Sequence, residues 1–311
     1  MRAVYFKNGE VELRDIPQYQ DEGIRVHVRS IGICSSDLHM LEAKFPIPCI
    51  PGHEIAGVLD DGTPVAVEPL VPCDKCASCL AGDYNLCRMG AAGILGVGLN
   101  GGMADELRVP VRCLVNLPAN VDVRDACLTE PIAVAVHGMS KAGLEGGQRV
   151  AVIGGGTTGL CAVAIARASN AIVGLSARYS HQTAAGQLLG AKEIEGQYDL
   201  VVECAGTETA VNQAIKLCRS GGKILMLSTH WGGLTLSQSA AQLKEIAIVL
   251  SFMYASSSPG RDFDIAAMLL ARHPEIAKAL ITHRYPLAEA KQAFAVARDR
   301  KAGAIKVILE P

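Results

Sequence analysis

The stretch Arg149-Val-Ala-Val-Ile-Gly-Gly-Gly-Thr-Thr-Gly159 decides the fold predicted for this chain. Five residues that suit a buried strand lead into a G-x-G-x-x-G turn, and a helical pattern then continues to Ala168. Glycines let the backbone turn tightly and approach a pyrophosphate, while the start of the helix offers N–H groups to that anion. A glycine turn with only a structural role is the alternative. The flanking strand and helix favour a dinucleotide site formed by Gly154, Gly156, Thr157, Thr158 and Gly159.

Apolar strands and helical patterns alternate around this turn. Strands are predicted at residues 149–153, 171–175, 198–203 and 223–227, and helices at 158–168, 182–189 and 209–218. Such a β-α rhythm predicts a parallel sheet with helices on both faces, the doubly wound Rossmann arrangement.

The segment before Pro118 has a different pattern. Short alternating strands, such as residues 26–29 and 65–68, are separated by turn residues about every eight to twelve positions. This pattern predicts an irregular, β-rich domain. After residue 258 come helical patterns at 264–271 and 287–298 and a strand at 305–309. A chain of 311 residues is long enough for two domains, so the predicted fold class is α/β with two domains.

The composition excludes several classes of protein. Half of the residues are hydrophobic, which excludes a disordered chain. The net charge of −2, without a run of Lys or Arg, gives no reason to expect a nucleic-acid partner. The longest uncharged run, Val150 to Ala166, is interrupted by glycines and falls short of the about 20 apolar residues of a membrane helix, so no membrane partner is expected. Eleven cysteines, four of them crowded together, indicate a reducing compartment and hence the cytoplasm.

The end of the second predicted strand bears on the choice of dinucleotide. An NAD site normally carries an acidic residue there, but no Asp or Glu occurs between Glu145 and Glu193. Arg178 can instead pair with a 2′-phosphate, and Ser176 can add a hydroxyl contact. These residues favour NADP over NAD. The alternative is that Arg178 is only a solvated loop residue.

Four cysteines follow one another at short spacing in residues 73–87. The pattern C-x2-C-x2-C-x7-C describes a closed structural Zn²⁺ site, in which the metal orders a loop rich in turn residues. The spacing alone does not exclude an iron–sulfur cluster. Zinc is favoured because the four cysteines lie in the predicted β-rich domain. The predicted ligands are Cys73, Cys76, Cys79 and Cys87.

A second set of metal ligands is spread along the chain. Cys34, His53 and Glu54 offer sulfur, imidazole and carboxylate, and Glu130 adds a further carboxylate. A catalytic zinc takes three protein ligands and keeps one position open. Taken singly, each residue also has a structural explanation: a buried thiol, a hydrogen-bonded histidine, or a carboxylate at a helix start.

These motifs together resemble the zinc-dependent medium-chain alcohol dehydrogenases, especially the sorbitol/polyol dehydrogenase branch. The resemblance spans nearly the whole chain, and the motifs occur in the order of that family. They are Gly32–His39, Pro51–Glu54, the four cysteines, Glu130–His137 and the glycine turn.

The resemblance implies a fold, a reaction and an assembly. We expect a GroES-like catalytic zinc domain of residues 1–130 and 259–311 and a Rossmann domain of residues 131–258. The implied reaction is zinc-dependent hydride transfer between a secondary alcohol or polyol, or its ketone, and a nicotinamide cofactor. Two zinc ions, one catalytic and one structural, and a homodimer or homotetramer are implied.

Residue roles are implied by position in the matching motifs. Cys34 and His53 match the zinc ligands, and Glu54 matches a carboxylate that can ligate directly or exchange with water. Glu130 occupies the place of a second cysteine in classical alcohol dehydrogenases, and the choice between Glu54 and Glu130 as direct ligand stays open.

Three residues near Cys34 match supporting roles. Asp37 matches the residue that orients the ligand histidine, and Ser36 and His39 match a proton relay. The segment from His53 to Glu68 is shorter than is usual for the family, which weakens inference about the substrate. Polyols, sugars, amino-hydroxy compounds and simple secondary alcohols therefore all remain open as substrates.

Two other functions are compatible with the same fold. A zinc-free reductase or quinone oxidoreductase would usually lack both cysteine and histidine ligand sets. A non-catalytic relative would have no need of Ser36 and His39 together.

Overall fold

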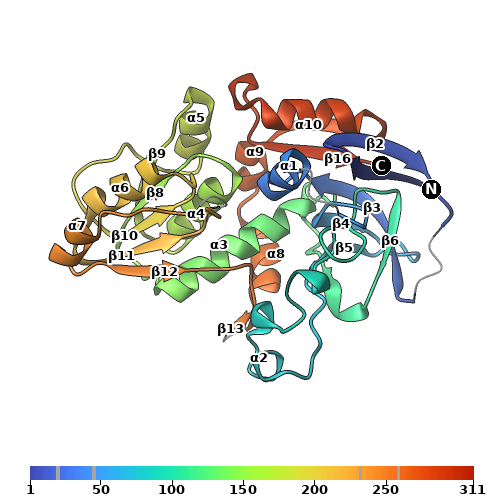
Figure 1. Cartoon of the computed structure of the whole chain (residues 1–311), viewed down its shortest axis with the longest axis horizontal. Coiled ribbons are helices and arrows are strands. Elements are labelled where there is room, and N and C mark those ends of the chain that lie inside the picture. The colour runs from blue at the N-terminus through green and yellow to red at the C-terminus, as the bar shows by residue number, and fades with distance from the viewer. Residues whose placement is uncertain (19–21, 44–46, 231–232, 258–259) are drawn as a thin grey trace. The chain divides into compact units, whose positions relative to one another are not determined.

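The computed structural model describes residues 1–18, 22–43, 47–230, 233–257 and 260–311 (Figure 1). The chain divides into two compact units: unit 1 comprises residues 1–130, 255–277 and 281–311, and unit 2 comprises residues 131–254 and 278–280. The sequence-based boundary between residues 258 and 259 lies outside the described residues. No helix among the described residues combines the length and the apolar character needed to cross a membrane.

Unit 2 contains a five-stranded parallel sheet in the order β12-β11-β10-β8-β9 (Figure 1). The predicted parallel sheet is therefore confirmed, with the glycine turn between its strand β8 and helix α4. The strand β12 at one edge was not predicted from the sequence. The strands are β8 (Arg149–Ile153), β9 (Ile172–Ser176), β10 (Tyr198–Glu203), β11 (Cys218–Met226) and β12 (Ala247–Leu250). The helices are α3 (Thr129–Ala142, beginning in unit 1), α4 (Thr157–Ala168), α5 (Ser180–Leu188), α6 (Glu208–Leu217) and α7 (Gln238–Leu243).

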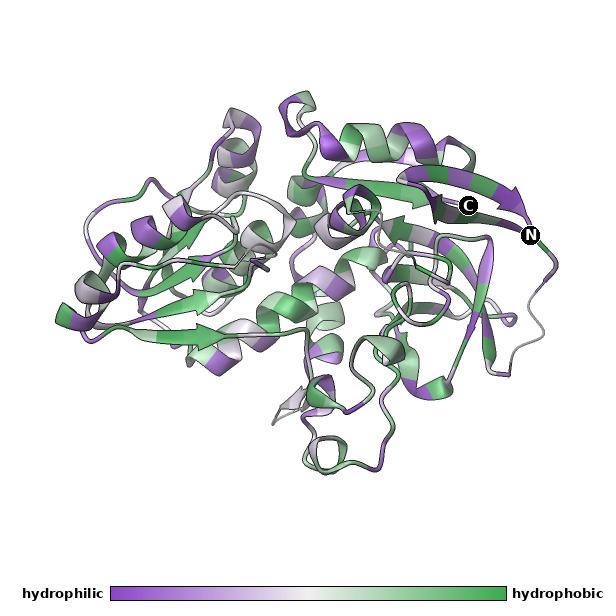
Figure 2. Ribbon diagram, in the orientation of Figure 1, coloured by the Kyte–Doolittle hydropathy of each residue, from purple (hydrophilic) through white to green (hydrophobic). Residues whose placement is uncertain are grey.

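Helices cover both faces of this sheet, whose strands consist mostly of hydrophobic residues (Figure 2). Val152 and Leu175 are partners in neighbouring strands and so share one face. Helix α4 packs against Val152 and α5 against Leu175. The other face, which carries Ala151 and Ile153, packs against α6 and α7. Helices on both faces of a parallel sheet form the doubly wound arrangement that the sequence predicted.

Unit 1 is built around a sheet in the order β15-β16-β3-β4-β5-β7, with β6 also paired to β3. All of its pairings are antiparallel except that of β15 with β16. Its strands are β3 (Ile24–Gly32), β4 (Glu54–Val58), β5 (Pro64–Val67), β6 (Glu106–Val109), β7 (Leu114–Asn116), β15 (Ile281–Pro286) and β16 (Lys306–Glu310).

Smaller elements complete unit 1. Two hairpins pair β1 (Arg2–Lys7) with β2 (Glu10–Asp15) and β13 (Ser256–Ser257) with β14 (Gly260–Arg261). The helices are α1 (Ser35–Glu42), α2 (Ala77–Leu80), α8 (Asp262–Arg272), α9 (Glu275–Leu280, ending in unit 2) and α10 (Ala290–Arg298). Short 3₁₀ helices lie at Tyr84–Leu86, Gly90–Gly93, Val111–Cys113, Ala126–Leu128, Leu287–Glu289 and Arg300–Ala302.

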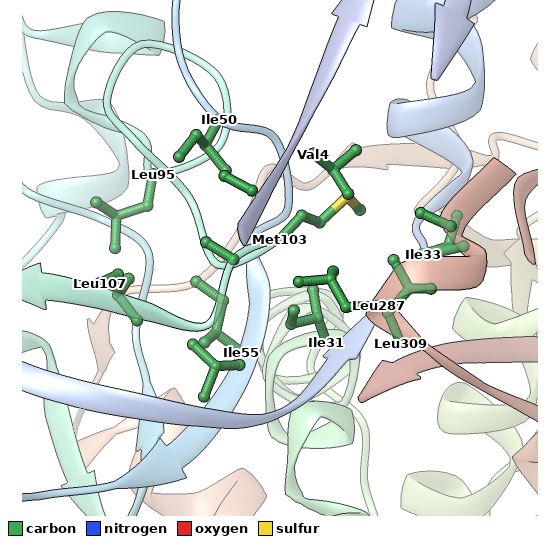
Figure 3. Packing of buried hydrophobic residues seen from close by; sticks show 14 of the residues in the cluster. Val4, Ile31, Ile33, Ile50, Ile55, Leu95, Met103, Leu107, Leu287 and Leu309 are labelled. Atoms are coloured by element: carbon green, nitrogen blue, oxygen red, sulfur yellow. The ribbon is translucent and has the colours of Figure 1, made fainter. Parts of the chain in front are cut away.

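The core of unit 1 joins segments from both ends of the chain. Val4, Ile31, Met103 and Leu309 are fully buried in one cluster (Figure 3). The pairing of β3 with β4 sets Gly32 opposite Glu54, and the pairing of β3 with β16 sets Gly32 opposite Ile308. This register brings the start of β16 to the segment that carries the predicted metal ligands.

Candidate functional site

The four predicted zinc-binding cysteines lie together in unit 1. One ligand atom from each of Cys73, Cys76, Cys79 and Cys87 lies within 4.8 Å of all the others. The Sγ atom of Cys76 is 3.4 Å from that of Cys79 and 4.0 Å from that of Cys87. A tetrahedral Zn–S₄ centre with bonds of about 2.3 Å has sulfur–sulfur edges of about 3.8 Å, so these separations fit a zinc ion. They are far too long for a disulfide, whose S–S bond is about 2.05 Å.

Backbone N–H groups favour thiolates in this cluster. The N–H groups of Cys73 and Met89 point at Cys87 Sγ, over 3.2 and 3.4 Å. Hydrogen bonds from the backbone of Arg88 and of Cys79 lower the pKa of Cys76 to about 6, whereas burial raises the pKa of Cys79 to about 12. Because thiolate is the form of cysteine that binds metal, these N–H groups favour binding of a metal cation by the four cysteines.

The second predicted ligand group also comes together. Cys34 follows β3 immediately before α1, while His53 and Glu54 lie at the start of β4. Ligand atoms of these three residues lie within 4.8 Å of one another. Glu130, at the start of α3, lies outside this mutually close group, although its charge acts on His53. His53, Glu54 and Glu130 are all buried.

Polar groups of α1 surround His53. Asp37 Oδ1 lies 3.7 Å from His53 Nδ1, and Asp37 Oδ2 accepts the N–H of Cys34 at 2.9 Å. Ser36 Oγ lies 3.4 Å from His53 Nε2. Burial disfavours the charged form of His53, but the charges of Asp37 and Cys34 outweigh it and hold its pKa well above the ordinary value. Surroundings that favour positive charge on His53 fit a site for a metal cation.

The carboxylate of Glu54 has a buried partner that the sequence did not predict. Lys306 Nζ, at the start of β16, lies 2.6 Å from both oxygens of Glu54 and also donates to the carbonyl of Ile33 at 3.0 Å. A side chain at position 32 would meet the carboxylate, since a Cβ there would lie 1.8 Å from Glu54 Oε2. Gly32 therefore makes room for Glu54. The sequence feature that could have indicated this buried pair is a single lysine within the apolar run from Ile305 to Leu309.

The two predicted relay residues lie on one helix. Ser36 and His39 are three residues apart in α1 and so lie on one side of it. Ser36 is half-buried beside His53, whereas His39 is exposed. The pair thus spans the distance from the buried histidine to the protein surface.

The glycine turn predicted to bind the dinucleotide has a backbone conformation and a close packing that require glycine. Gly154 has a φ of 108°, in the region that favours glycine. A Cβ on Gly159 would lie 1.9 Å from the carbonyl oxygen of Gly154, so this glycine permits close packing of α4 on β8. Gly156 is the N-cap of α4, and Thr157 and Thr158 form its first turn. The turn thus fits a pyrophosphate at a helix start.

The residues predicted to contact the 2′-phosphate lie at the end of β9 and just after it. Ser176 Oγ accepts a hydrogen bond of 3.0 Å from Gln213 Nε2, a partner that the sequence did not predict. Arg178 is exposed, and its guanidinium carbon lies 5.6 Å from the centre of the Tyr179 ring. An exposed cation at this strand end is compatible with a bound phosphate group.

Comparisons with known proteins agree with these features. The alcohol dehydrogenase GroES-like domain matches residues 20–119, and the zinc-binding dehydrogenase model matches residues 173–307. L-galactonate-5-dehydrogenase of Escherichia coli (strain K12) is 30% identical over 312 residues, covering 90% of this chain and 89% of that protein.

Two solved structures are similar over essentially the full length. Galactitol-1-phosphate dehydrogenase from Escherichia coli is 27% identical with a TM-score of 0.87, and the match covers 100% of each chain. A zinc-binding dehydrogenase from Sinorhizobium meliloti 1021, solved with NADP, is 27% identical with a TM-score of 0.87, covering 100% of this chain and 99% of that chain.

Proposed function

The chain belongs to the zinc-binding medium-chain alcohol dehydrogenases, in the branch of the polyol dehydrogenases, and from this premise we propose that it transfers hydride between a secondary alcohol or polyol, or its ketone, and a nicotinamide dinucleotide. The observation that carries this proposal is the meeting of Cys34, His53 and Glu54 within 4.8 Å. We assign unit 1 the role of catalytic domain and unit 2 that of dinucleotide-binding domain.

The catalytic metal site is assigned to Cys34 and His53 together with a carboxylate. Glu54 has the supporting geometry, because its oxygens lie near the other two ligand atoms. Lys306 binds the same carboxylate and thereby balances one of the negative charges of the site. Glu130 is the other candidate carboxylate, and its charge acts on His53. The four-cysteine lobe is assigned to a structural zinc ion.

The catalytic zinc would lower the pKa of a substrate hydroxyl or polarise a substrate carbonyl. The protein side chains orient and move the proton. Asp37 holds the imidazole of His53 in place through its nearby carboxylate. Ser36 accepts the proton of the substrate hydroxyl as its own proton leaves toward His39, which is exposed on the same side of α1 and releases a proton to water.

The cofactor is assigned to the glycine turn of unit 2. Gly154, Gly156 and Gly159 let the pyrophosphate approach the start of α4, where Thr157 and Thr158 lie. NADP is favoured over NAD, because the end of β9 carries Ser176 and Arg178 and lacks an acidic residue.

We further propose a homodimer or homotetramer and a cytoplasmic location. A homodimer or homotetramer is supported by the edge strand β12, where Ile248 and Leu250 are 40% and 68% exposed, and by the neighbouring Phe252, 54% exposed. All eleven cysteines are free thiols, which fits a reducing compartment such as the cytoplasm.

One experiment tests the function. The purified protein is analysed for metal and screened with polyols, sugar acids, secondary alcohols and their ketones, using NADP⁺ and NAD⁺ side by side. Two zinc ions per chain and cofactor reduction by at least one alcohol are expected. Absence of zinc combined with reduction of a carbon–carbon double bond would favour the zinc-free reductase instead. Absence of turnover with all substrates would favour a non-catalytic relative.

A further inference from the structure

Three polar side chains meet at one end of the sheet of unit 2. Glu203 is the last residue of β10 and is fully buried. The hydroxyl of Ser228, just after β11, donates a short hydrogen bond to Glu203 Oε2. His230 Nε2 lies 3.2 Å from Ser228 Oγ and 3.4 Å from Glu203 Oε2. The three residues form one hydrogen-bonded cluster.

This cluster lies at the same edge of the sheet as the glycine turn. Glu203, Ser228 and His230 are at or beyond the carboxyl ends of β10 and β11, and β10 is the neighbour of β8. Glu203 Oε1 accepts the N–H groups of Ala205 and Gly206, at 2.7 and 2.8 Å. A Cβ on Gly154 would lie 3.0 Å from the backbone nitrogen of Ala205, so the segment that Glu203 holds packs directly against the turn.

The hydrogen bonds determine which nitrogen of His230 is available. A carboxylate and a hydroxyl oxygen beside Nε2 favour a hydrogen on that nitrogen, which leaves Nδ1 as an acceptor in the neutral ring. Among the described residues no hydrogen-bond partner is found for Nδ1. The side chain of His230 is 12% exposed, so the ring is held in place and still accessible at its margin.

The order of the strands indicates which part of a dinucleotide would reach this ring. Strand β8, with the glycine turn, lies between β9 on one side and β10 and β11 on the other. The β9 side carries Ser176 and Arg178, at the position that reads the adenosine ribose. A dinucleotide with its pyrophosphate at the turn therefore extends its nicotinamide half toward the ends of β10 and β11.

Resting on the function proposed above, we propose that His230 binds a ribose hydroxyl in the nicotinamide half of the cofactor through Nδ1. Glu203 and Ser228 orient the ring for this contact. A histidine ring oriented in this way presents Nδ1 to a sugar hydroxyl. The cluster thereby adds a cofactor-binding residue to unit 2 that the glycine turn and β9 do not supply.

The test uses variants that separate Nδ1 from the rest of the cluster. In the variant His230→Gln, the side-chain amide lies where Nε2 was and can keep the hydrogen bond to Ser228. No polar atom of this variant replaces Nδ1. In the variant His230→Asn, the shorter side chain places its amide where Nδ1 was. His283→Gln, at a half-buried histidine of β15 in unit 1, is the matched control. Calorimetry measures binding of NADP⁺ and NAD⁺, and of the fragments 2′,5′-ADP and AMP, which lack the nicotinamide half.

We expect His230→Gln to weaken binding of the full dinucleotides about tenfold, as expected for a lost hydrogen bond, and to leave fragment binding within about twofold. His230→Asn should recover part of that affinity. Equal losses for dinucleotides and fragments, or no loss at all, would overturn the role of His230. If the native protein binds fragments and dinucleotides to no measurable extent, the dinucleotide function itself fails, which is a separate result from failure of the variant series.

Discussion

The Nζ atom of Lys306 lies 2.6 Å from both carboxylate oxygens of Glu54, and the two side chains are 2% and 1% exposed. Burial lowers the pKa of Lys306, but the charge of Glu54 outweighs burial and raises it above the ordinary value. A buried pair of this kind leaves an uncompensated charge when either partner is removed. The stability of unit 1 therefore depends on the charge of Glu54, which is also a proposed ligand of the metal.

Replacing Lys306 with methionine should strongly destabilise unit 1. The variant leaves Glu54 buried without its cation, which typically lowers the free energy of unfolding by about 3–5 kcal/mol. Urea denaturation of metal-free protein measures the change. The double variant Lys306→Met with Glu54→Gln should recover much of the loss, whereas Lys291→Met at an exposed ion pair should change stability by less than about 1 kcal/mol. A small effect of Lys306→Met alone would contradict this interpretation of the pair.

Replacing Asp37 with asparagine should weaken metal binding at Cys34 and His53. The amide oxygen can still accept the N–H of Cys34, but the negative charge beside His53 Nδ1 is lost. Loss of such a supporting carboxylate typically lowers metal affinity about 10–100-fold. Competition with a chromophoric chelator measures the affinity, and Asp122→Asn, at an exposed position, serves as control. Unchanged zinc affinity would show that Asp37 supports only the helix start.

Replacing Cys76 with serine should remove one zinc ion per chain and leave the other. The remaining three thiols no longer close a tetrahedral site, so the segment 73–87 loses the metal that orders it. Metal analysis should fall from two zinc ions to one, and limited proteolysis should cut within this segment. Cys49→Ala, at a buried cysteine outside both groups, should keep both ions. Loss of both ions from Cys76→Ser would mean that the two sites are not independent.

Replacing Arg178 with alanine should weaken the binding of NADPH more than the binding of NADH. A charge-assisted hydrogen bond to a phosphate is worth about 1.5–3 kcal/mol, so we expect about 10–100-fold weaker binding of NADPH. NADH lacks the 2′-phosphate, and its binding should change by less than about threefold. Titration of protein fluorescence with each cofactor gives both constants, with Arg29→Ala as control. Equal losses for the two cofactors would argue against a phosphate contact.

Unfolding at low pH should depend on Glu310. Burial disfavours its charge, but hydrogen bonds from Arg124 and Arg284 outweigh burial and lower its pKa below the ordinary value of 4.5. A carboxyl with a lowered folded-state pKa contributes stability that is complete above its unfolded value and is lost as the pH falls through the folded value. We expect Glu310→Gln to be less stable than the native protein at pH 6 and to lose less further stability between pH 4.5 and 3. Parallel curves for both proteins would contradict this.

Local motifs were predictable from the sequence because their function depends on short spacing. The glycine turn, the four cysteines and the β-α alternation each lie within a single continuous segment, and the structure confirms the fold that they predict. The family resemblance drawn from the same motifs is confirmed by the relative that is 30% identical. The site roles inferred from those motifs remain predictions.

Features that depend on pairing between distant strands were not predictable. Lys306 reaches Glu54 only because β16 pairs with β3, and no spacing rule connects positions 252 residues apart. Helix α1 was missed because its eight residues lack a long apolar pattern and begin only two residues after β3. The partner of Ser176, Gln213, comes from a helix that sequence spacing cannot orient.

The sheet of unit 1 takes strands from residues 24–116 and from residues 281–310, whereas all five strands of unit 2 lie within residues 149–250. Closing so long a loop costs more entropy than closing a short one, and sheets with such distant pairings form more slowly. During synthesis on the ribosome, the intervening unit can complete its sheet before β16 has emerged. Until then, the end of β3 at Ile31 and Gly32 has no partner strand on the side that β16 later covers.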